Sequence, residues 1–206
     1  MGLIYFPACL LVGVSLSACT SFQSAGSIAQ GRQSLFQGNN QAALGYFQTA
    51  AQADPSYIYG TELQEGTLSF LGRAQYLNGD YARAGSTLEK ALAQHKDDNI
   101  ARLYLGLTLA RQGDTQQGLR DIDAGLTGIY DFLNYIDNNF RFTFGRFWDP
   151  GRAIRSAIER ARTMIASGKI DWPALIADGE WIAMNTEEEP DQARLQQQQE
   201  RSLHAD

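Results

Sequence analysis

The sequence predicts an all-α fold in which about three helical hairpins stack side by side and further helices cap the C-terminal end. When residues 65–98 are laid over residues 99–132, a shift of 34, glycines and large apolar residues recur at the same spacing. In both copies a glycine–aspartate pair, Gly79-Asp80 and Gly113-Asp114, interrupts the helical pattern where a turn inside the repeat is needed. These two observations predict a helical-hairpin solenoid.

The N-terminal segment has the features of an export signal. Residues 3–18 form an apolar run of signal-peptide length that is too short, and interrupted by Pro7, to span a membrane comfortably. The run ends in Leu16-Ser17-Ala18-Cys19, which resembles the lipobox of bacterial lipoproteins, although no Lys or Arg precedes it.

The lipobox resemblance implies removal of the signal peptide, residues 1–18, and lipidation of Cys19, whose acyl chains would anchor the protein in a membrane. Thr20 stands where an aspartate would retain a lipoprotein at the inner membrane. The resemblance therefore implies sorting to the outer membrane, facing the periplasm. The alternative is an ordinary secretory signal cut after Ala18, with Cys19 incidental.

Residues 19–132 carry the repeats, whose glycines and turns keep their places from copy to copy. Gly31, Gly72 and Gly106 are expected to let paired helices approach closely. An earlier copy begins near Ser24, and an insertion at 56–64 lengthens its connection to the next copy. Its matching positions are Gly31, Gly38, Asn39, Ala43, Phe47, Ala50 and Pro55.

This pattern resembles the tetratricopeptide repeat (TPR) over about residues 24–132. The resemblance implies a concave groove, lined by side chains, that binds an extended peptide or a partner helix. The outer copies depart from the family pattern, since Ser27 and Gln30 replace large apolar residues and Gly118 and Gly125 replace alanines. Such degeneracy is common in repeats that cap an array.

Residues 133–185 are expected to form a C-terminal capping segment. Apolar spacing and turn residues predict one helix from Pro150 to about Ser167 and another that opens at Asp171. Beyond them, residues 186–206 are acidic and rich in glutamine, which predicts a disordered tail.

An unusual aromatic and arginine-rich stretch lies at the start of the capping segment. Either it folds back over the exposed end of the third repeat, or it forms a contact surface for a partner. The candidate partner-binding residues are Phe140, Arg141, Phe142, Phe144, Arg146, Phe147 and Trp148.

Composition argues against several classes of function. A net charge of −6 disfavours nucleic-acid binding, which needs cations to neutralise phosphates. The two histidines, His95 and His204, are isolated, and both cysteines lie within the first twenty residues. No catalytic constellation, metal site or cofactor motif is recognisable, so we expect neither enzymatic activity nor a cofactor.

The leading expectation is a lipid-anchored periplasmic scaffold or adaptor that helps assemble or position a cell-envelope complex. Its partners would be envelope proteins of unspecified identity. It would also be attached to the membrane through the lipid on Cys19. One rival is a solute-binding or transport accessory lipoprotein with an aromatic pocket around Phe140 to Trp148. Another is an enzyme acting on cell-wall material with carboxylates brought together from separate helices.

Overall fold

The computed structural model describes residues 12–203, apart from the side chains of residues 12–19, 189, 191, 201 and 203. Most of the expected signal peptide and the end of the tail therefore lie outside the described residues. No helix within that range is both long and apolar enough to cross a membrane. The elements in chain order are α1 (Val12–Phe36), α2 (Asn40–Ala53), β1 (Ile58–Tyr59), β2 (Glu65–Gly66), α3 (Thr67–Leu77), α4 (Tyr81–Gln94), α5 (Asn99–Gln112), α6 (Thr115–Phe140), the 3-10 helix η1 (Phe144–Phe147), α7 (Ala153–Ser167) and α8 (Trp172–Leu203).

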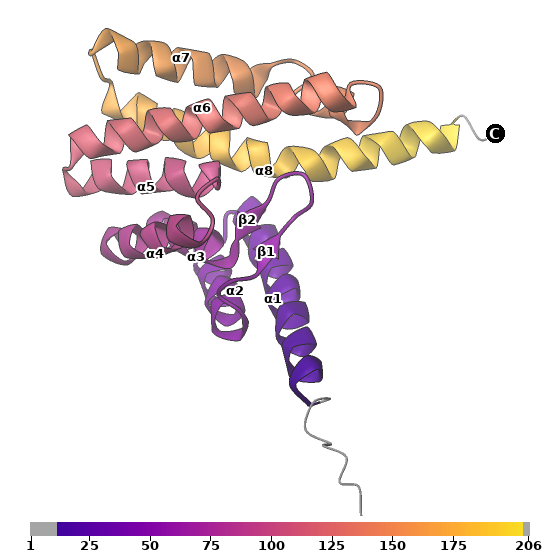
Figure 1. Cartoon of the computed structure of the whole chain (residues 1–206). Coiled ribbons are helices and arrows are strands. Elements are labelled where there is room, and N and C mark those ends of the chain that lie inside the picture. The colour runs from indigo at the N-terminus through magenta and orange to yellow at the C-terminus, as the bar shows by residue number, and fades with distance from the viewer. Residues whose placement is uncertain (1–11, 204–206) are drawn as a thin grey trace, which may run out of the picture.

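The fold is the expected all-α solenoid. Three hairpins, α1 with α2, α3 with α4 and α5 with α6, follow one another, and each packs on the next (Figure 1). Helix α7 packs on α6, and α8 then returns beneath α6, contacts α5 and passes above α1. The last turns of α8 extend beyond the other helices (Figure 1).

Each hairpin turns through a glycine in the left-handed conformation. The φ angle is +74° at Gly38, +79° at Gly79 and +95° at Gly113, values that other residues adopt only with strain. The side chain after each glycine accepts a hydrogen bond of 3.1 to 3.2 Å from the backbone N–H three residues later, which caps the second helix. The capping residues are Asn39, Asp80 and Asp114.

The close approach expected at the helix glycines is confirmed. A Cβ atom at Gly72 would lie 2.6 Å from Cγ of Leu88, and one at Gly106 would lie 2.5 Å from the backbone nitrogen of Ile122. The second contact is with backbone, which cannot move aside as a side chain does. Paired helices therefore meet at distances that only glycine allows.

The insertion at 56–64 forms a small antiparallel ribbon with the two residues that follow it, between the first and second hairpins. Strand β1 pairs with β2 through Ile58 opposite Gly66 and Tyr59 opposite Glu65. Tyr59 meets the ring of Phe70 edge-on, with centroids 5.9 Å apart. The ribbon is thereby fixed against α3.

The apolar core divides into two clusters. The smaller lies between the first hairpin and α3, where the rings of Phe47 and Phe70 stack 5.3 Å apart. The larger runs from α4 and α5 through α6 and α7 into α8, and it includes Leu103, Ile122 and Ile182. The C-terminal helices thus share a core with the third repeat and cap it.

Helix α7 begins three residues later than Asp149-Pro150 suggested. Asp149 and Arg152 both have positive φ angles, 51° and 55°, so the chain turns between them instead of entering the helix. The Asp149 carboxylate still caps α7, because its Oδ1 accepts a hydrogen bond of 2.9 Å from the N–H of Ile154. The same carboxylate pairs with the buried Arg155 at 3.0 Å.

The structure also differs from the tail expected from residue 186 onward. Helix α8 continues through this segment to Leu203, with Pro190 inside it. Its polar composition predicted disorder because few side chains can be buried. Thr186, Glu187 and Ala193 are nevertheless buried, since the rest of the molecule offers them a surface that the local sequence does not reveal.

Candidate partner-binding groove

One position in every repeat faces α8. It is the residue that follows the close-approach glycine of the first helix: Arg32 in α1, Arg73 in α3 and Leu107 in α5. Near Leu107 the α8 backbone comes so close that a Cβ atom at Gly179 would lie 3.1 Å from a Leu107 methyl carbon. The two arginines both reach Glu187. Helix α8 therefore lies along the inward helices of the repeats, where a bound helix would be expected.

Glu187 joins α8 to the first and second repeats. Arg32 donates from Nε to the Glu187 carboxylate at 2.7 Å and from Nη2 to the Glu187 backbone carbonyl at 2.9 Å. Arg73 donates from Nη1 to the other carboxylate oxygen. The Arg73 and Glu187 side chains are only 2% and 3% exposed. We call Arg32, Arg73 and Glu187 the buried clamp.

The electrostatics of the clamp keep Glu187 ionised. Burial by itself raises the pKa of Glu187, but the charge of Arg73 and the hydrogen bonds from Arg73 and Arg32 outweigh it. The pKa of Glu187 is therefore lowered from its ordinary value. An ionised carboxylate is what two buried guanidinium groups require for compensation.

Aromatic rings surround both guanidinium groups of the clamp. The Arg73 guanidinium lies 5.3 Å from the ring centroid of Phe70 and 5.9 Å from that of Tyr104. The Arg32 guanidinium lies 5.5 Å from the ring of Phe36 and 5.4 Å from that of Tyr59. Cation–π contacts of this kind stabilise a cation while excluding water from it.

A second buried carboxyl, Glu65, lies beside the clamp. Glu65 and Glu187 both line a cavity of about 270 Å³ between the ribbon, α1 and α8. Burial, and then the charge of Glu187, raise the pKa of Glu65 well above its ordinary value. Its Oε2 has no hydrogen-bond partner in the part of the chain that the structure describes.

Two carboxyls whose pKa values shift in opposite directions also occur in acid–base active sites. Here the geometry favours a structural role, because both Glu187 oxygens are engaged by arginines and Glu65 Oε2 is covered from solvent. A general acid or base must reach the proton that it transfers. The two carboxyls and the two arginines are therefore arranged to hold α8 in place.

Further polar contacts follow α8 on either side of the clamp. Towards its start, Tyr76 donates a hydrogen bond of 2.6 Å to Glu180, which also lies 3.7 Å from Arg111. Beyond the clamp, exposed ion pairs join Arg194 to Glu62 of the ribbon loop and Glu200 to Arg146 of η1.

Asp98 ties the ribbon to the third repeat. It caps α5 by accepting from the N–H of Ala101 at 2.8 Å, and it also accepts from the N–H of Gly66 and the hydroxyl of Ser69. Burial raises the pKa of Asp98 in spite of these hydrogen bonds.

The aromatic and arginine-rich stretch divides into a packed part and an exposed part. Phe140 and Phe144 stack with centroids 4.9 Å apart, and Trp148, 1% exposed, meets Phe132 edge-on at 5.3 Å. These packed rings cover the end of the third repeat. Phe147 lies beneath the guanidinium of Arg146, at 4.6 Å.

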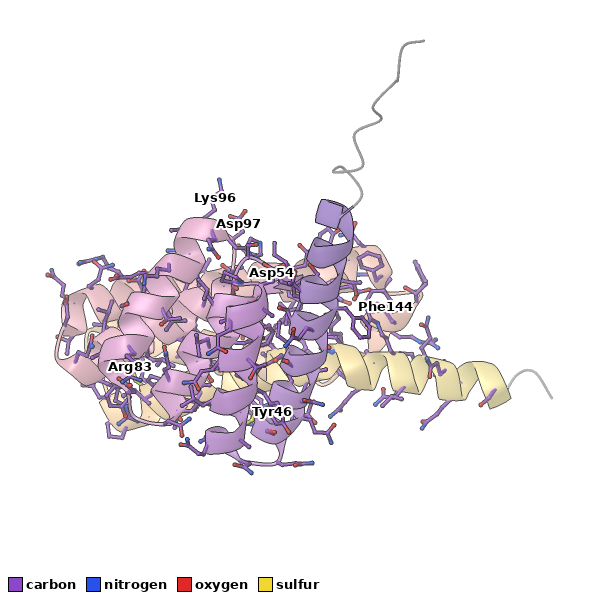
Figure 2. The ribbon with its side chains drawn as sticks, turned by 90° about the horizontal axis from the view of Figure 1, so that it is seen from below. Tyr46, Asp54, Arg83, Lys96, Asp97 and Phe144 are labelled. Carbon is purple, nitrogen blue, oxygen red and sulfur yellow. The ribbon has the colours of Figure 1, made fainter. Side chains whose placement is uncertain are left out.

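The exposed part consists of Arg141 and Phe142. Phe142 is 90% exposed, and Arg141 beside it is also exposed. Figure 2 shows Phe144 on the side of the molecule where the outer part of α8 emerges. Partner binding by this stretch stays a prediction.

Cys19, the candidate lipidation site, lies within α1, but its side chain is outside the described part of the molecule. Its lipidation also stays a prediction.

Sequence reasoning missed the buried clamp. The available signal was the repeat register, since Arg32 and Arg73 occupy the position that Leu107 fills in the third repeat. Two arginines at an inward-facing position indicate an anionic counterpart. The sequence does not reveal that this counterpart is Glu187, which lies 155 residues after Arg32.

Comparison with known proteins agrees with this architecture. Residues 71–128 match the family model of the tetratricopeptide repeat, a range that covers most of the second hairpin, all of α5 and about half of α6. No curated protein matches the chain. The first hairpin, outside the matched range, has the same glycine turn, capping residue and inward-facing arginine. Over residues 71–128 the chain is therefore similar to tetratricopeptide repeats, a family of typically non-catalytic modules that mediate protein–protein interaction.

Proposed function

We propose that the protein is a lipid-anchored scaffold on the periplasmic face of the outer membrane, where it helps assemble or position a cell-envelope complex. The tetratricopeptide match at residues 71–128 is the observation that carries the interaction role. The sequence Leu16-Ser17-Ala18-Cys19 supports the anchor.

The position of Cys19 relative to the first hairpin suits an anchor. Ser24 is the first buried side chain in the described part of α1, and its hydroxyl donates a hydrogen bond of 3.0 Å to the carbonyl of Ala50. Before it, the hydroxyl of Ser21 donates a hydrogen bond of 3.2 Å to Asp54 at the end of α2, so the contacts of α1 with the second helix begin after Cys19. Cleavage before Cys19 would leave that packing intact.

The same position suggests which edge would face the bilayer. In Figure 2 the start of α1 lies at the edge that also carries Asp54, Lys96 and Asp97, whereas Arg83 lies away from it. Asp54 and the Lys96-Asp97 pair belong to the connections between hairpins, and Arg83 follows a turn within one. A lipid on Cys19 would hold the inter-hairpin connections near the membrane and leave the opposite turns free.

The anchor is tested by replacing Cys19. The Cys19→Ser variant should lose labelling by radioactive palmitate and move from the membrane fraction to the soluble periplasmic fraction. Retention of the label in this variant would contradict lipidation at Cys19.

The scaffold role is tested by crosslinking in living cells, followed by gentle detergent extraction, purification on a C-terminal tag and mass spectrometry. A specific envelope protein should be recovered with the unaltered chain. The double variant Arg141→Glu, Phe142→Ala changes the exposed part of the aromatic stretch and should lower that recovery. Tyr46→Ala, which removes a partly exposed ring from α2, is the matched control. Failure to recover any specific partner would overturn the scaffold proposal.

A further inference from the structure

The outer segment of α8, residues 187–203, is held much less firmly than the part before it. Among its described side chains only Glu187 and Ala193 are buried. The inner segment, residues 172–186, buries Leu175, Ile182 and Ala183 in the main core. Opening the outer segment would therefore expose little apolar surface.

A proline marks the place where the two segments can separate. Pro190 lies inside α8 and has no backbone N–H to donate to the carbonyl of Thr186, one turn earlier. Its ring also crowds that carbonyl. The helical hydrogen bonding is thus weakest beside Glu187, the residue that enters the clamp.

The clamp keeps donor capacity that Glu187 does not use. Arg73 gives Glu187 only its Nη1, and its Nε and Nη2 have no partner in the part of the chain that the structure describes. Nε and Nη2 point from the same side of a guanidinium and together match the two oxygens of a carboxylate. A carboxylate that is not constrained by α8 could therefore accept from both Nε and Nη2 of Arg73, which Glu187 does not.

We propose that Arg32 and Arg73 form a seat for a carboxylate on a helical segment of a partner protein. Glu187 occupies this seat until α8 opens between Thr186 and Glu187, where Pro190 leaves out a helical hydrogen bond, and the outer segment swings away. Helix α8 itself supplies the argument for a helical partner, because its Glu187 shows that a glutamate on a helix fits both arginines. Two buried cations cannot stay uncompensated, so the exchange of one carboxylate for another is the way to open the clamp. This inference rests on the proposed scaffold function and names the chemistry of the partner segment.

The test uses the full chain, purified in detergent, and a fluorescent peptide with the sequence of residues 179–195 as the probe. Fluorescence anisotropy measures its binding to the unaltered chain and to Glu187→Gln, which keeps the size of the side chain and removes its charge. The variant should bind the peptide about tenfold more tightly, because its seat lacks a charged occupant. A peptide carrying the same Glu187→Gln change should lose that gain, whereas a Glu188→Gln peptide should keep it.

A second variant leaves the clamp untouched. Arg146→Ser combined with Arg194→Ser removes the two exposed ion pairs that hold the outer segment, and it should also tighten peptide binding. Arg83→Ser, which removes an exposed ion pair with Asp80 on α4, is the matched control and should leave binding unchanged. The double variant tests the seat even if Glu187→Gln fails to fold.

Equal peptide binding by the unaltered chain and both variants would overturn the seat, as would binding that ignores the Glu187→Gln change in the peptide. Formation of a dimer by Glu187→Gln in place of peptide binding would assign the seat to α8 of a second copy and overturn the partner assignment. Because the assay needs no cellular partner, its failure is distinct from failure of the scaffold proposal, which the crosslinking experiment decides.

Discussion

Helix α8 crosses the repeats with two different kinds of contact. At the third repeat it packs Gly179 and Ile182 into the apolar core beside Leu107. At the first and second repeats it relies on one ionised side chain, Glu187, between two buried arginines. Apolar burial stabilises without regard to direction. A buried ion pair instead fixes geometry and adds little net stability. The end of α8 that contains Ile182 therefore stabilises the fold, whereas the end that begins at Glu187 can exchange its place with another carboxylate-bearing helix.

The largest effect is expected where the apolar end is damaged. Ile182→Ala removes a fully buried side chain between α8 and the third repeat. It should lower the free energy of unfolding by about 2–5 kcal/mol, because the cavity left behind closes only partly. Urea unfolding followed by circular dichroism measures this loss. A loss below about 0.5 kcal/mol would show that α8 is not part of the core, since surface substitutions reach that value.

A smaller and local effect is expected at the exchangeable end. Pro190→Ala restores the missing N–H and should stabilise the outer segment of α8 by up to about 3 kcal/mol. Hydrogen exchange of the amides in 191–203 should slow, while exchange in α5 and α6 should stay as it was. If hydrogen exchange in α5 and α6 slowed to the same degree, the outer segment of α8 would open only together with the core. The two ends of α8 would then not differ in stability.

The smallest of the three effects concerns the carboxyl beside the clamp. The pKa of Glu65 is raised in the folded protein, so its stabilising effect is complete below pH 4.5, its ordinary pKa, and is lost as the pH rises towards the folded value. At pH 7 to 8, Glu65→Gln should therefore raise the free energy of unfolding by about 1 kcal/mol, which is seen as a higher melting temperature. Below pH 4.5 the variant and the unaltered chain should melt alike. A lower melting temperature for the variant at pH 8 would mean that Glu65 is ionised and supports Arg73.

The repeats could be predicted from sequence because their determinants are local. A left-handed turn at Gly79 or Gly113 and a close approach at Gly106 each require glycine, whatever lies elsewhere in the chain. The 34-residue register then follows from the repetition of those requirements. For the same reason the turns at Gly79-Asp80 and Gly113-Asp114 were placed correctly, and the structure adds that each aspartate caps the following helix.

The clamp and the end of α8 could not be predicted because their determinants are distant. Glu187 stands in a run of glutamates that reads as a solvated tail. Only the surface formed by α1 and α3 buries it and lets α8 continue as a helix. The aromatic stretch presented a similar choice, and the packing of Trp148 against Phe132 was visible only once α6 and η1 were in place.

The separation of Arg32 from Glu187 along the chain has a consequence for biogenesis. A polypeptide is synthesised from its N-terminus, so the first hairpin is made well before residue 187 is. Until then the guanidinium of Arg32 lacks the counter-ion that it has in the finished molecule. The contacts of the first repeat are therefore complete only when nearly the whole chain has been made, and a product truncated before Glu187 would leave Arg32 without this counter-ion.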